Sequence, residues 1–270
     1  MKRKLLFTDL DGTLLSTDKT VSAGNLRAIE EMVKQGHKFV VATGRPIQSA
    51  LQISEKYGWN KDGYLISSFN GGLIYDCGAK KDIKIRSMKK EDAKYILDRA
   101  HEMGIHAHTY DKVSVVSEYD TPELHKYAKG IGMPEKVVGN ILTDLLAEPI
   151  KTVVISYEGR NRLKDFSERI YDFAKNRLNY TFSNPTLLEY EDIRASKGES
   201  LLFLADYYHI DISDTIAAGD EENDLSMIEA AGVGAVMANG SDKAREKADY
   251  ITRSDNDHDG IAEIIERFIL

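Results

Sequence analysis

The sequence predicts an α/β protein in which a parallel β-sheet core, built from both ends of the chain, is interrupted by an inserted α+β domain. Two observations predict the core: strand and helix patterns alternate near the N-terminus, and the same alternation returns in the last third of the chain. The third observation is a middle region whose strand patterns lie close enough together to form hairpins.

The N-terminal elements follow in the order strand, helix, strand. Residues 5–10 are a short apolar run typical of a buried strand. Residues 22–35 have apolar side chains at helical spacing, begin at a capping serine and stop before Gly36. Lys38–Ala42 is again a strand, so this region is a βαβ unit whose functional loops lie at the carboxyl ends of parallel strands.

The C-terminal third repeats this order. Residues 200–209 and 225–230 predict helices, and residues 215–218 and 234–238 predict strands. Together the two ends of the chain predict a Rossmann-like parallel sheet.

The middle of the chain has a different pattern. His106–Tyr110 and residues 113–117 predict a hairpin, and residues 151–157 predict a further strand. Residues 120–131 and 162–177 predict helices. We therefore expect a discontinuous core of residues 1–83 and 189–270, with an α+β domain inserted at residues 84–188.

Composition limits the class of protein. The 270 residues suffice for one large or two modest domains, and 36 basic against 44 acidic residues give a net charge of −8. This charge argues against nucleic acid or an anionic membrane as partner, but not against a small anionic substrate. A single cysteine, Cys77, permits no internal disulfide. The basic N-terminus is followed by an apolar run that ends at Asp9, which is too short for a signal peptide. We expect a soluble, cytoplasmic protein.

Four short polar segments follow predicted strands or begin a helix. They are Asp9-Leu10-Asp11-Gly12-Thr13, Thr43-Gly44-Arg45, Lys197-Gly198, and Gly219-Asp220-Glu221-Glu222-Asn223-Asp224. The carboxyl ends of parallel strands converge on one crevice, so these segments should meet. Their carboxylates would repel one another without a cation, and an all-oxygen set suits Mg²⁺. The metal, Lys197 and Thr43 would together hold a phosphoryl group.

Each segment has an ordinary explanation when taken alone. Asp-x-Asp-Gly is usually a turn, Thr43 a loop hydroxyl and Lys197 a solvated lysine at a helix start. The occurrence of all four in order, each at the end of a strand or the start of a helix, argues against coincidence.

These segments, with Asn70-Gly71-Gly72, resemble the haloacid dehalogenase (HAD) superfamily, and especially its Cof-like sugar-phosphatase branch. The resemblance covers essentially the whole chain. It implies a Mg²⁺-dependent phosphatase that hydrolyses small phosphomonoesters, such as sugar phosphates or similar metabolites, through an aspartyl-phosphate. It also implies that the inserted domain is a cap that sets substrate specificity.

The resemblance implies a role for each matching residue. Asp9 would be the nucleophile and Asp11 the general acid/base. Mg²⁺ would be held by the Asp9 carboxylate, the Asp11 main-chain carbonyl and Asp220. Asp224 would support these groups without binding the metal directly. Phosphate would be held by the Leu10 main-chain N–H, Thr43, Gly44, Lys197 and Asn223.

General chemistry supports these roles. A carboxylate attacks a phosphate dianion only when nearby cations neutralise the repulsion. Asp11 can protonate the leaving alkoxide and then activate water, which favours hydrolysis over a long-lived phosphoenzyme. To act as an acid near neutral pH, Asp11 should have a raised pKa, although a nearby Mg²⁺ would lower that pKa. Two alternatives remain: a phosphomutase of the same superfamily, and a non-catalytic phospho-ligand-binding regulator.

Two further patterns have ordinary explanations. Residues 255–260, with Glu266, satisfy the spacing of an EF-hand loop, but the preceding residues 248–252 predict a strand. We expect an acidic loop that caps the last helix. The alternation of His106 and His108 predicts a solvated sheet face, with substrate contact as the alternative.

Overall fold

The computed structural model describes residues 2–270, which divide into two compact units. One unit consists of the two ends of the chain, up to Lys84 and from Ser196 to Leu270, and the other is Ile85–Ala195. The second unit extends beyond the expected limit at residue 188. The reason is that β11 (Leu187–Asp192) pairs along its length with β9 (Lys151–Ile155), a strand in the middle of the second unit.

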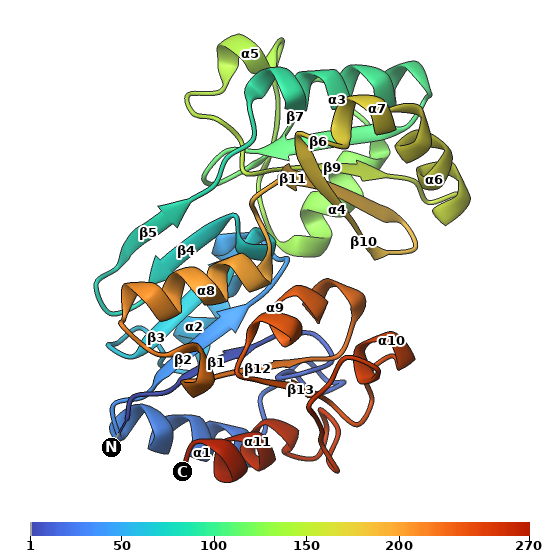
Figure 1. Ribbon diagram of the computed structural model, residues 1–270. Helices are drawn as coiled ribbons and strands as arrows, with labels where there is room; N and C mark the ends of the chain where they lie inside the picture. The colour runs from blue at the N-terminus through green and yellow to red at the C-terminus, as the bar shows by residue number, and fades with distance from the viewer. Residues whose placement is uncertain (1) are drawn as a thin grey trace. The chain divides into compact units, whose positions relative to one another are not determined.

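The first unit contains an eight-stranded sheet in the order β14-β13-β12-β1-β2-β3-β4-β5 (Figure 1). Its strands are β1 (Leu5–Thr8), β2 (Lys38–Ala42), β3 (Tyr64–Ser68), β4 (Leu73–Asp76), β5 (Lys81–Ile85), β12 (Thr215–Gly219), β13 (Val233–Val236) and β14 (Tyr250–Ile251). The strands from β14 to β3 pair in parallel, and β4 is antiparallel to β3. The predicted α/β class and the parallel centre of the sheet are confirmed.

Helices cover both faces of this sheet. They are α1 (Ala23–Lys34), α2 (Ile47–Lys56), α8 (Lys197–Tyr207), α9 (Leu225–Ala230), α10 (Asp242–Arg245) and α11 (Gly260–Phe268), with short 3₁₀ turns η1 (Phe69–Gly71), η2 (Ile212–Asp214) and η3 (Glu222–Asp224). Helix α8 packs beside α9, and α1 packs beside α11 (Figure 1). Alternate strand residues such as Leu5, Phe7 and Val40 form one apolar core with Leu201 and Leu204 of α8.

The second unit contains a six-stranded sheet in the order β10-β11-β9-β6-β7-β8. Its further strands are β6 (His106–Tyr110), β7 (Val115–Ser117), β8 (Glu135–Val137) and β10 (Leu178–Asn184), and its helices are α3 (Lys90–Glu102), α4 (Pro122–Ile131), α5 (Ile141–Asp144), α6 (Arg160–Arg169) and α7 (Tyr171–Ala174). The antiparallel pair β6–β7 confirms the predicted hairpin. The single helix expected over residues 162–177 is instead two helices, because the chain leaves the helical conformation at Ile170.

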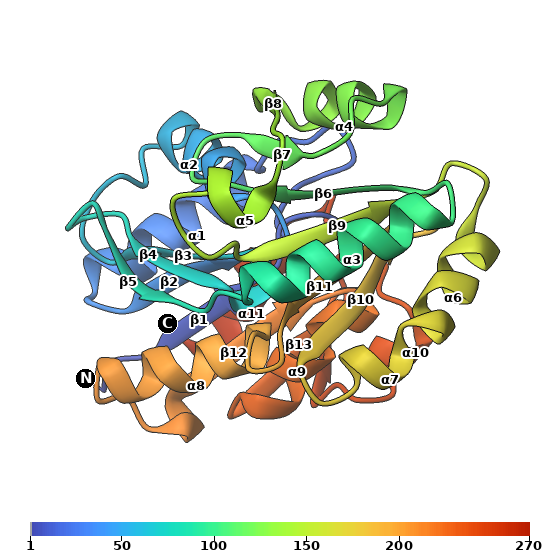
Figure 2. The same ribbon diagram turned by 90° about the horizontal axis from the view of Figure 1, so that it is seen from above.

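The two faces of this second sheet differ in chemistry. Helix α3 runs along β6 and β9 (Figure 2), and its Ile96 and Leu97 pack with Val154 and Leu188 in an apolar core. The opposite face of β6 carries His106 and His108, and it was expected to be solvated. That expectation is wrong, because both imidazoles are buried.

A chain of hydrogen bonds explains how this face tolerates burial. His106 contacts Thr121 on one side and His108 on the other, at 2.8 and 3.1 Å. His108 is 3.3 Å from the Tyr110 hydroxyl, which in turn lies 2.6 Å from the hydroxyl of Tyr127 on α4. Each side chain of this chain of hydrogen bonds therefore has a polar partner within the unit.

The acidic loop at residues 255–259 is not an EF-hand, since strand β14 and not a helix precedes it. Helix α11 does begin just after the loop, at Gly260. Asp259 is the N-cap residue of α11, as expected of a loop that caps this helix, although its side chain makes no capping hydrogen bond. That side chain instead accepts a hydrogen bond from Ser22 at the start of α1. Asp257 accepts two bonds from Thr17. The loop thus ties together two segments of the first unit.

No helix within residues 2–270 combines the length and the apolar character needed to cross a membrane.

Candidate active site

Asp9 and Asp11 lie in the turn that follows β1. The Asp9 amide donates to the Ala218 carbonyl of the neighbouring strand at 2.9 Å, so the nucleophile candidate is fixed by the sheet itself. Gly12 has φ +83°, and a Cβ on Gly12 would lie only 2.3 Å from Asp220 Oδ2. Glycine is therefore required here for both the backbone conformation and the approach of Asp220.

Asp220 follows β12, the strand next to β1. The Thr13 hydroxyl donates to Asp220 Oδ1 at 2.6 Å. The amides of Asp220 and Glu221 both donate to Asp224 Oδ2, at 2.9 and 3.1 Å. These bonds hold the 3₁₀ turn η3 next to the end of β12. The carboxylates of Asp220 and Asp224 are thus held by short local contacts and cannot swing freely.

Lys197 is the first residue of α8. The Ser196 hydroxyl caps this helix by accepting from the Glu199 amide, which starts the helix three residues before the predicted position. Lys197 Nζ lies 2.5 Å from Asp9 Oδ1 and 2.6 Å from Asp224 Oδ1, and the lysine is 1% exposed. The lysine therefore bridges the ends of two strands at the centre of the site.

Three carboxylates gather around this lysine. Oxygens of Asp9, Asp220 and Asp224 lie within 4.8 Å of one another, and all three residues are buried. Burial raises the pKa of Asp9 to about 8 and the pKa of Asp220 to about 7. Burial alone would lower the pKa of Lys197, but Asp224 and Asp9 hold it above its usual value. If all three carboxylates were ionised, one lysine among them would leave an excess of negative charge.

The donor set fits a hard divalent cation. Carboxylate oxygens are the ligands that Mg²⁺ takes from proteins, usually through one or two side chains with water completing the shell. The raised pKa values of Asp9 and Asp220 indicate that a further positive charge is needed to keep both ionised at neutral pH. The residues predicted as metal ligands through their carboxylates are thus brought together by the fold.

Thr43 and Gly44 follow β2, beside the end of β1. The Thr43 amide donates to the Ser67 carbonyl at 2.8 Å, and its hydroxyl accepts from the Arg45 amide at 3.1 Å. A Cβ on Gly44 would lie 2.9 Å from Asn70 Oδ1. Asn70 has φ +49°, so a strained backbone at the end of β3 supports this segment.

The Asp11 carboxylate is not part of the three-carboxylate cluster. It forms a two-point ion pair with the Arg45 guanidinium, and Lys19 Nζ lies 2.9 Å from its Oδ1. Burial alone would raise the pKa of Asp11, but Arg45 and Lys19 lower it below its usual value. The raised pKa expected for a general acid is therefore wrong for this state of the protein, because two cations lie on a half-buried carboxylate.

The remaining predicted residues lie in the same region of the first unit. Leu10 is buried in the turn after Asp9, and the half-buried Asn223 lies in η3 beside Asp224. Sequence reasoning gave no role to Thr13, Arg45 or Lys19. Thr13 and Arg45 belong to the polar segments that follow β1 and β2, so their place in the sequence could have indicated a role in the site. Lys19 is an exposed lysine outside these segments, and nothing in the sequence indicated its contact with Asp11.

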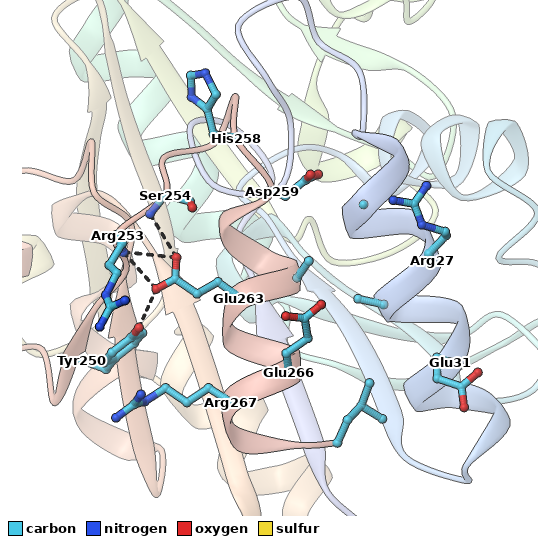
Figure 3. Close-up of a pocket in the computed structure, with 14 residues that line it drawn as sticks. Arg27, Glu31, Tyr250, Arg253, Ser254, His258, Asp259, Glu263, Glu266 and Arg267 are labelled. Atoms are coloured by element: carbon cyan, nitrogen blue, oxygen red, sulfur yellow. Dashed lines mark hydrogen bonds between the residues drawn. The ribbon is translucent and has the colours of Figure 1, made fainter.

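A cavity of about 830 Å³ lies elsewhere in the first unit, where α1, α11 and the end of β14 meet (Figure 3). Its polar centre is Glu263, which accepts from the amides of Arg253 and Ser254 and from the Tyr250 hydroxyl (Figure 3). These hydrogen bonds link α11 to β14 and the residues that follow it, so the Glu263 carboxylate has a structural role.

Comparison with known proteins identifies the family. A family model described as haloacid dehalogenase-like hydrolase matches residues 6–265. The chain belongs to this family. A 5-amino-6-(5-phospho-D-ribitylamino)uracil phosphatase of Bacillus subtilis is 29% identical, with 98% of each chain covered. Among solved structures, a haloacid dehalogenase-like hydrolase of Bacteroides thetaiotaomicron has a TM-score of 0.88 and 30% identity, over 98% of this chain and 99% of that one.

A second solved structure, from Thermotoga maritima, has a TM-score of 0.83 and 28% identity over 98% of this chain and 97% of that one. Fold, family and the phosphatase names of the curated relatives agree. The chain is a phosphatase of the haloacid dehalogenase family, that is, a phosphoric monoester hydrolase.

Proposed function

We propose that this phosphatase is Mg²⁺-dependent and hydrolyses small phosphomonoesters, such as sugar phosphates or similar metabolites, through an aspartyl-phosphate on Asp9. The observation that carries the proposal is the buried Lys197, which contacts Asp9 at 2.5 Å beside the carboxylates of Asp220 and Asp224. A buried lysine in this place would neutralise charge where an anionic ester approaches the Asp9 carboxylate.

Mg²⁺ would be held by the carboxylates of Asp9 and Asp220 and by the main-chain carbonyl of Asp11. When bound, it supplies positive charge to the phosphoryl oxygens. Asp224 orients the set, since its two oxygens accept from Lys197 and from the amides of Asp220 and Glu221. A support of this kind keeps ligands in place without being a ligand itself.

The phosphate group would contact Lys197, the Thr43 hydroxyl, Asn223, and the main chain at Leu10 and Gly44. Thr43 is fixed by hydrogen bonds to Ser67 and Arg45, and Gly44 next to it is closely approached by Asn70, so the main chain of this segment has little freedom. Rigid donors are effective because no reorganisation is needed when charge develops on the phosphoryl oxygens.

Asp9 Oδ attacks phosphorus, and the bond to the leaving oxygen breaks. Asp11 gives its proton to that oxygen and later takes a proton from the water that cleaves the aspartyl-phosphate. Asp11 begins this cycle as an ion pair with Arg45 and must therefore acquire its proton when the site is loaded. The second unit, residues 85–195, would be the cap that sets substrate specificity.

Two findings support a small metabolite as substrate. The relative from Bacillus subtilis is named for a phosphorylated ribitylamino compound. The net charge of −8 disfavours a nucleic-acid polymer as partner.

The test is a screen for release of inorganic phosphate from a panel of phosphorylated metabolites, with Mg²⁺ present and with EDTA. We expect release from several small esters with Mg²⁺ and none with EDTA. Conversion to a phosphate isomer without release would instead indicate a phosphomutase. Saturable binding of esters without any turnover would indicate a regulator.

A further inference from the structure

Asn70-Gly71-Gly72 is the one segment of the family resemblance to which the proposed function gives no role. It follows β3, and the turn η1 that precedes β4 has an unusual backbone. Phe69 has φ +50°, Asn70 has φ +49° and Gly71 has φ +99°. Within residues 2–270, no other two neighbouring non-glycine residues both have positive φ. A left-handed conformation is rare for a bulky residue such as Phe69, so the surroundings must impose it.

The main chain of this turn is fixed by the loop that follows β2. The Phe69 amide donates to the Arg45 carbonyl at 3.1 Å, and the Asn70 amide donates to the Thr43 carbonyl at 3.0 Å. These bonds continue the parallel pairing of β2 and β3 beyond the ends of both strands. The turn and the loop are therefore held together.

The Asn70 side chain lies against Gly44. A Cβ on Gly44 would be 2.9 Å from Asn70 Oδ1 and 3.5 Å from its Nδ2, so the amide group occupies the space beside this glycine. Asn70 is only 6% exposed, so its amide group is almost completely enclosed by protein. Close packing of this kind leaves the Gly44 main chain little room to rotate.

The turn also contacts the start of α8. A Cβ on Gly71 would lie 2.2 Å from the Ser196 carbonyl oxygen and 2.5 Å from Ser200 Oγ. Only glycine allows this approach, and glycine also adopts the positive φ of this position freely. Lys197, the buried lysine of the site, lies between these two serines in the sequence. The turn thus connects the loop after β2 to the helix end that carries Lys197.

We propose that Asn70 is a positioning residue for phosphate binding: its side chain holds the Gly44 main chain in place, while the turn keeps this main chain in register with Lys197. The proposal rests on the proposed function, in which Gly44 and Lys197 contact the phosphate group. Asn70 itself forms no bond to phosphate and transfers no proton. Since the phosphoryl group is common to all phosphomonoesters, loss of this support should weaken the binding of every ester and of inorganic phosphate alike.

The experiment measures the affinity for inorganic phosphate, with Mg²⁺ present, from the rise in melting temperature with phosphate concentration, which needs no turnover. Asn70→Gly removes the side chain but permits the left-handed backbone, so this variant should fold. His209→Gly is the matched control, because His209 also has a positive φ, of +53°, but is exposed and follows the opposite end of α8. We expect a roughly tenfold loss of phosphate affinity in Asn70→Gly and none in His209→Gly.

Kinetics with two esters test the same point by turnover. The esters are p-nitrophenyl phosphate and the best alkyl phosphate from the screen. We expect Asn70→Gly to lower kcat/KM by the same factor for both, because only the shared phosphoryl group is affected. Unchanged phosphate affinity in folded Asn70→Gly would overturn the proposal. A loss confined to one ester would also overturn it, since Asn70 would then act on the leaving group.

A double-mutant cycle tests whether Asn70 acts through Gly44. Gly44→Ala introduces a Cβ that collides with the Asn70 side chain, and Asn70→Gly makes room for it. The loss of phosphate affinity in the double variant should therefore be smaller than the product of the two single losses. Losses that simply multiply would show two independent effects and contradict the proposal.

Asn70→Ala separates positioning from stability. Alanine lacks the amide group and also disfavours a φ of +49°, so this variant should melt at a lower temperature than Asn70→Gly but lose the same amount of phosphate affinity. If phosphate affinity instead followed melting temperature, the role of Asn70 would be structural only and the proposal would fail. Turnover of esters by the wild type tests the proposed function separately, whereas the ratio of phosphate affinities between variant and wild type tests the positioning of Gly44.

Discussion

Lys197 Nζ contacts Asp9 Oδ1 at 2.5 Å and Asp224 Oδ1 at 2.6 Å, so one fully buried cation joins the ends of strands β1 and β12. Asp9 is 188 positions away in sequence. Removing one member of a buried ion pair typically costs about 3–5 kcal/mol, because the partner is left unpaired in a low-dielectric environment. Lys197 therefore has both a structural and a chemical role.

We expect Lys197→Met to lower the free energy of unfolding by a few kcal/mol and phosphatase activity by more than about 100-fold. Urea unfolding and a phosphate-release assay measure the two effects. Lys243→Met is the control, because Lys243 pairs with Glu222 on the surface, where ion pairs contribute at most about 1 kcal/mol. Near-wild-type turnover by folded Lys197→Met would remove this lysine from the chemistry.

Asp9→Asn should abolish turnover while leaving the fold intact, because the amide has nearly the same shape but is not a nucleophile. We expect less than about a hundredth of wild-type activity, since loss of a covalent nucleophile has a large effect. The control is Asp206→Asn, which neutralises an exposed acid on α8. Activity of folded Asp9→Asn above that level would exclude Asp9 as the nucleophile.

Mg²⁺ should raise the melting temperature of the wild type and EDTA should reverse the rise. A ligand that binds only the folded state at 100 times its Kd stabilises it by about 2.7 kcal/mol. The Asp220→Asn variant should lose most of this shift, because it removes one of the three clustered carboxylates. A shift of equal size in Asp220→Asn would mean that Mg²⁺ binds elsewhere.

The sequence predicted the core of this fold well because its strands are short, apolar and separated by capped helices. Lys38–Ala42 is a strand at the predicted residues, and α1 begins directly after the predicted cap Ser22. The helix break at Ile170 was not predictable, because the helical pattern continues across it. The meeting of Asp9 and Asp220 follows from parallel topology, because they end the neighbouring strands β1 and β12. Lys197 instead begins α8, which follows a strand of the second unit.

Side-chain partners were harder to predict than positions. Asp11 was placed correctly in the turn after β1, but its ion pair with Arg45 depends on the rotamer of a long side chain from another loop. The burial of His106 was missed because alternation along one strand does not reveal what covers its face. Such contacts are set by tertiary packing.

Stability should fall between neutral pH and pH 4 because of His106. Burial lowers its pKa from 6.5 to about 4, although the charge of Glu123 opposes this, and His108 is shifted the same way. The unfolded chain therefore takes up protons as the pH drops below 6.5 while the folded chain does not, so that stability is present above pH 6.5 and lost on acidification. At about 1.4 kcal/mol per pKa unit, the loss amounts to a few kcal/mol.

Hydrogen exchange of the β6 amides at pH 7 and pH 5 measures this loss after correction for intrinsic exchange rates. We expect His106→Gln to flatten the difference. His125→Gln is the control, since His125 is exposed and its pKa is raised by a hydrogen bond to Glu135. An unchanged pH dependence in His106→Gln would show that this imidazole does not titrate on unfolding.

Asp11→Asn should separate the two halves of the reaction. Asp9 and Lys197 remain in contact in this variant, so attack on phosphorus should persist, but the leaving oxygen is no longer protonated. An alkyl phosphate expels a basic alkoxide, so its first step should slow by roughly 10²–10⁴-fold, and an aryl phosphate much less. Water is not activated either, and the aspartyl-phosphate should accumulate. Rapid mixing with p-nitrophenyl phosphate should therefore give a burst of phenolate close to one per enzyme, followed by slow turnover. If both esters slow equally and no burst is seen, Asp11 is not the general acid/base.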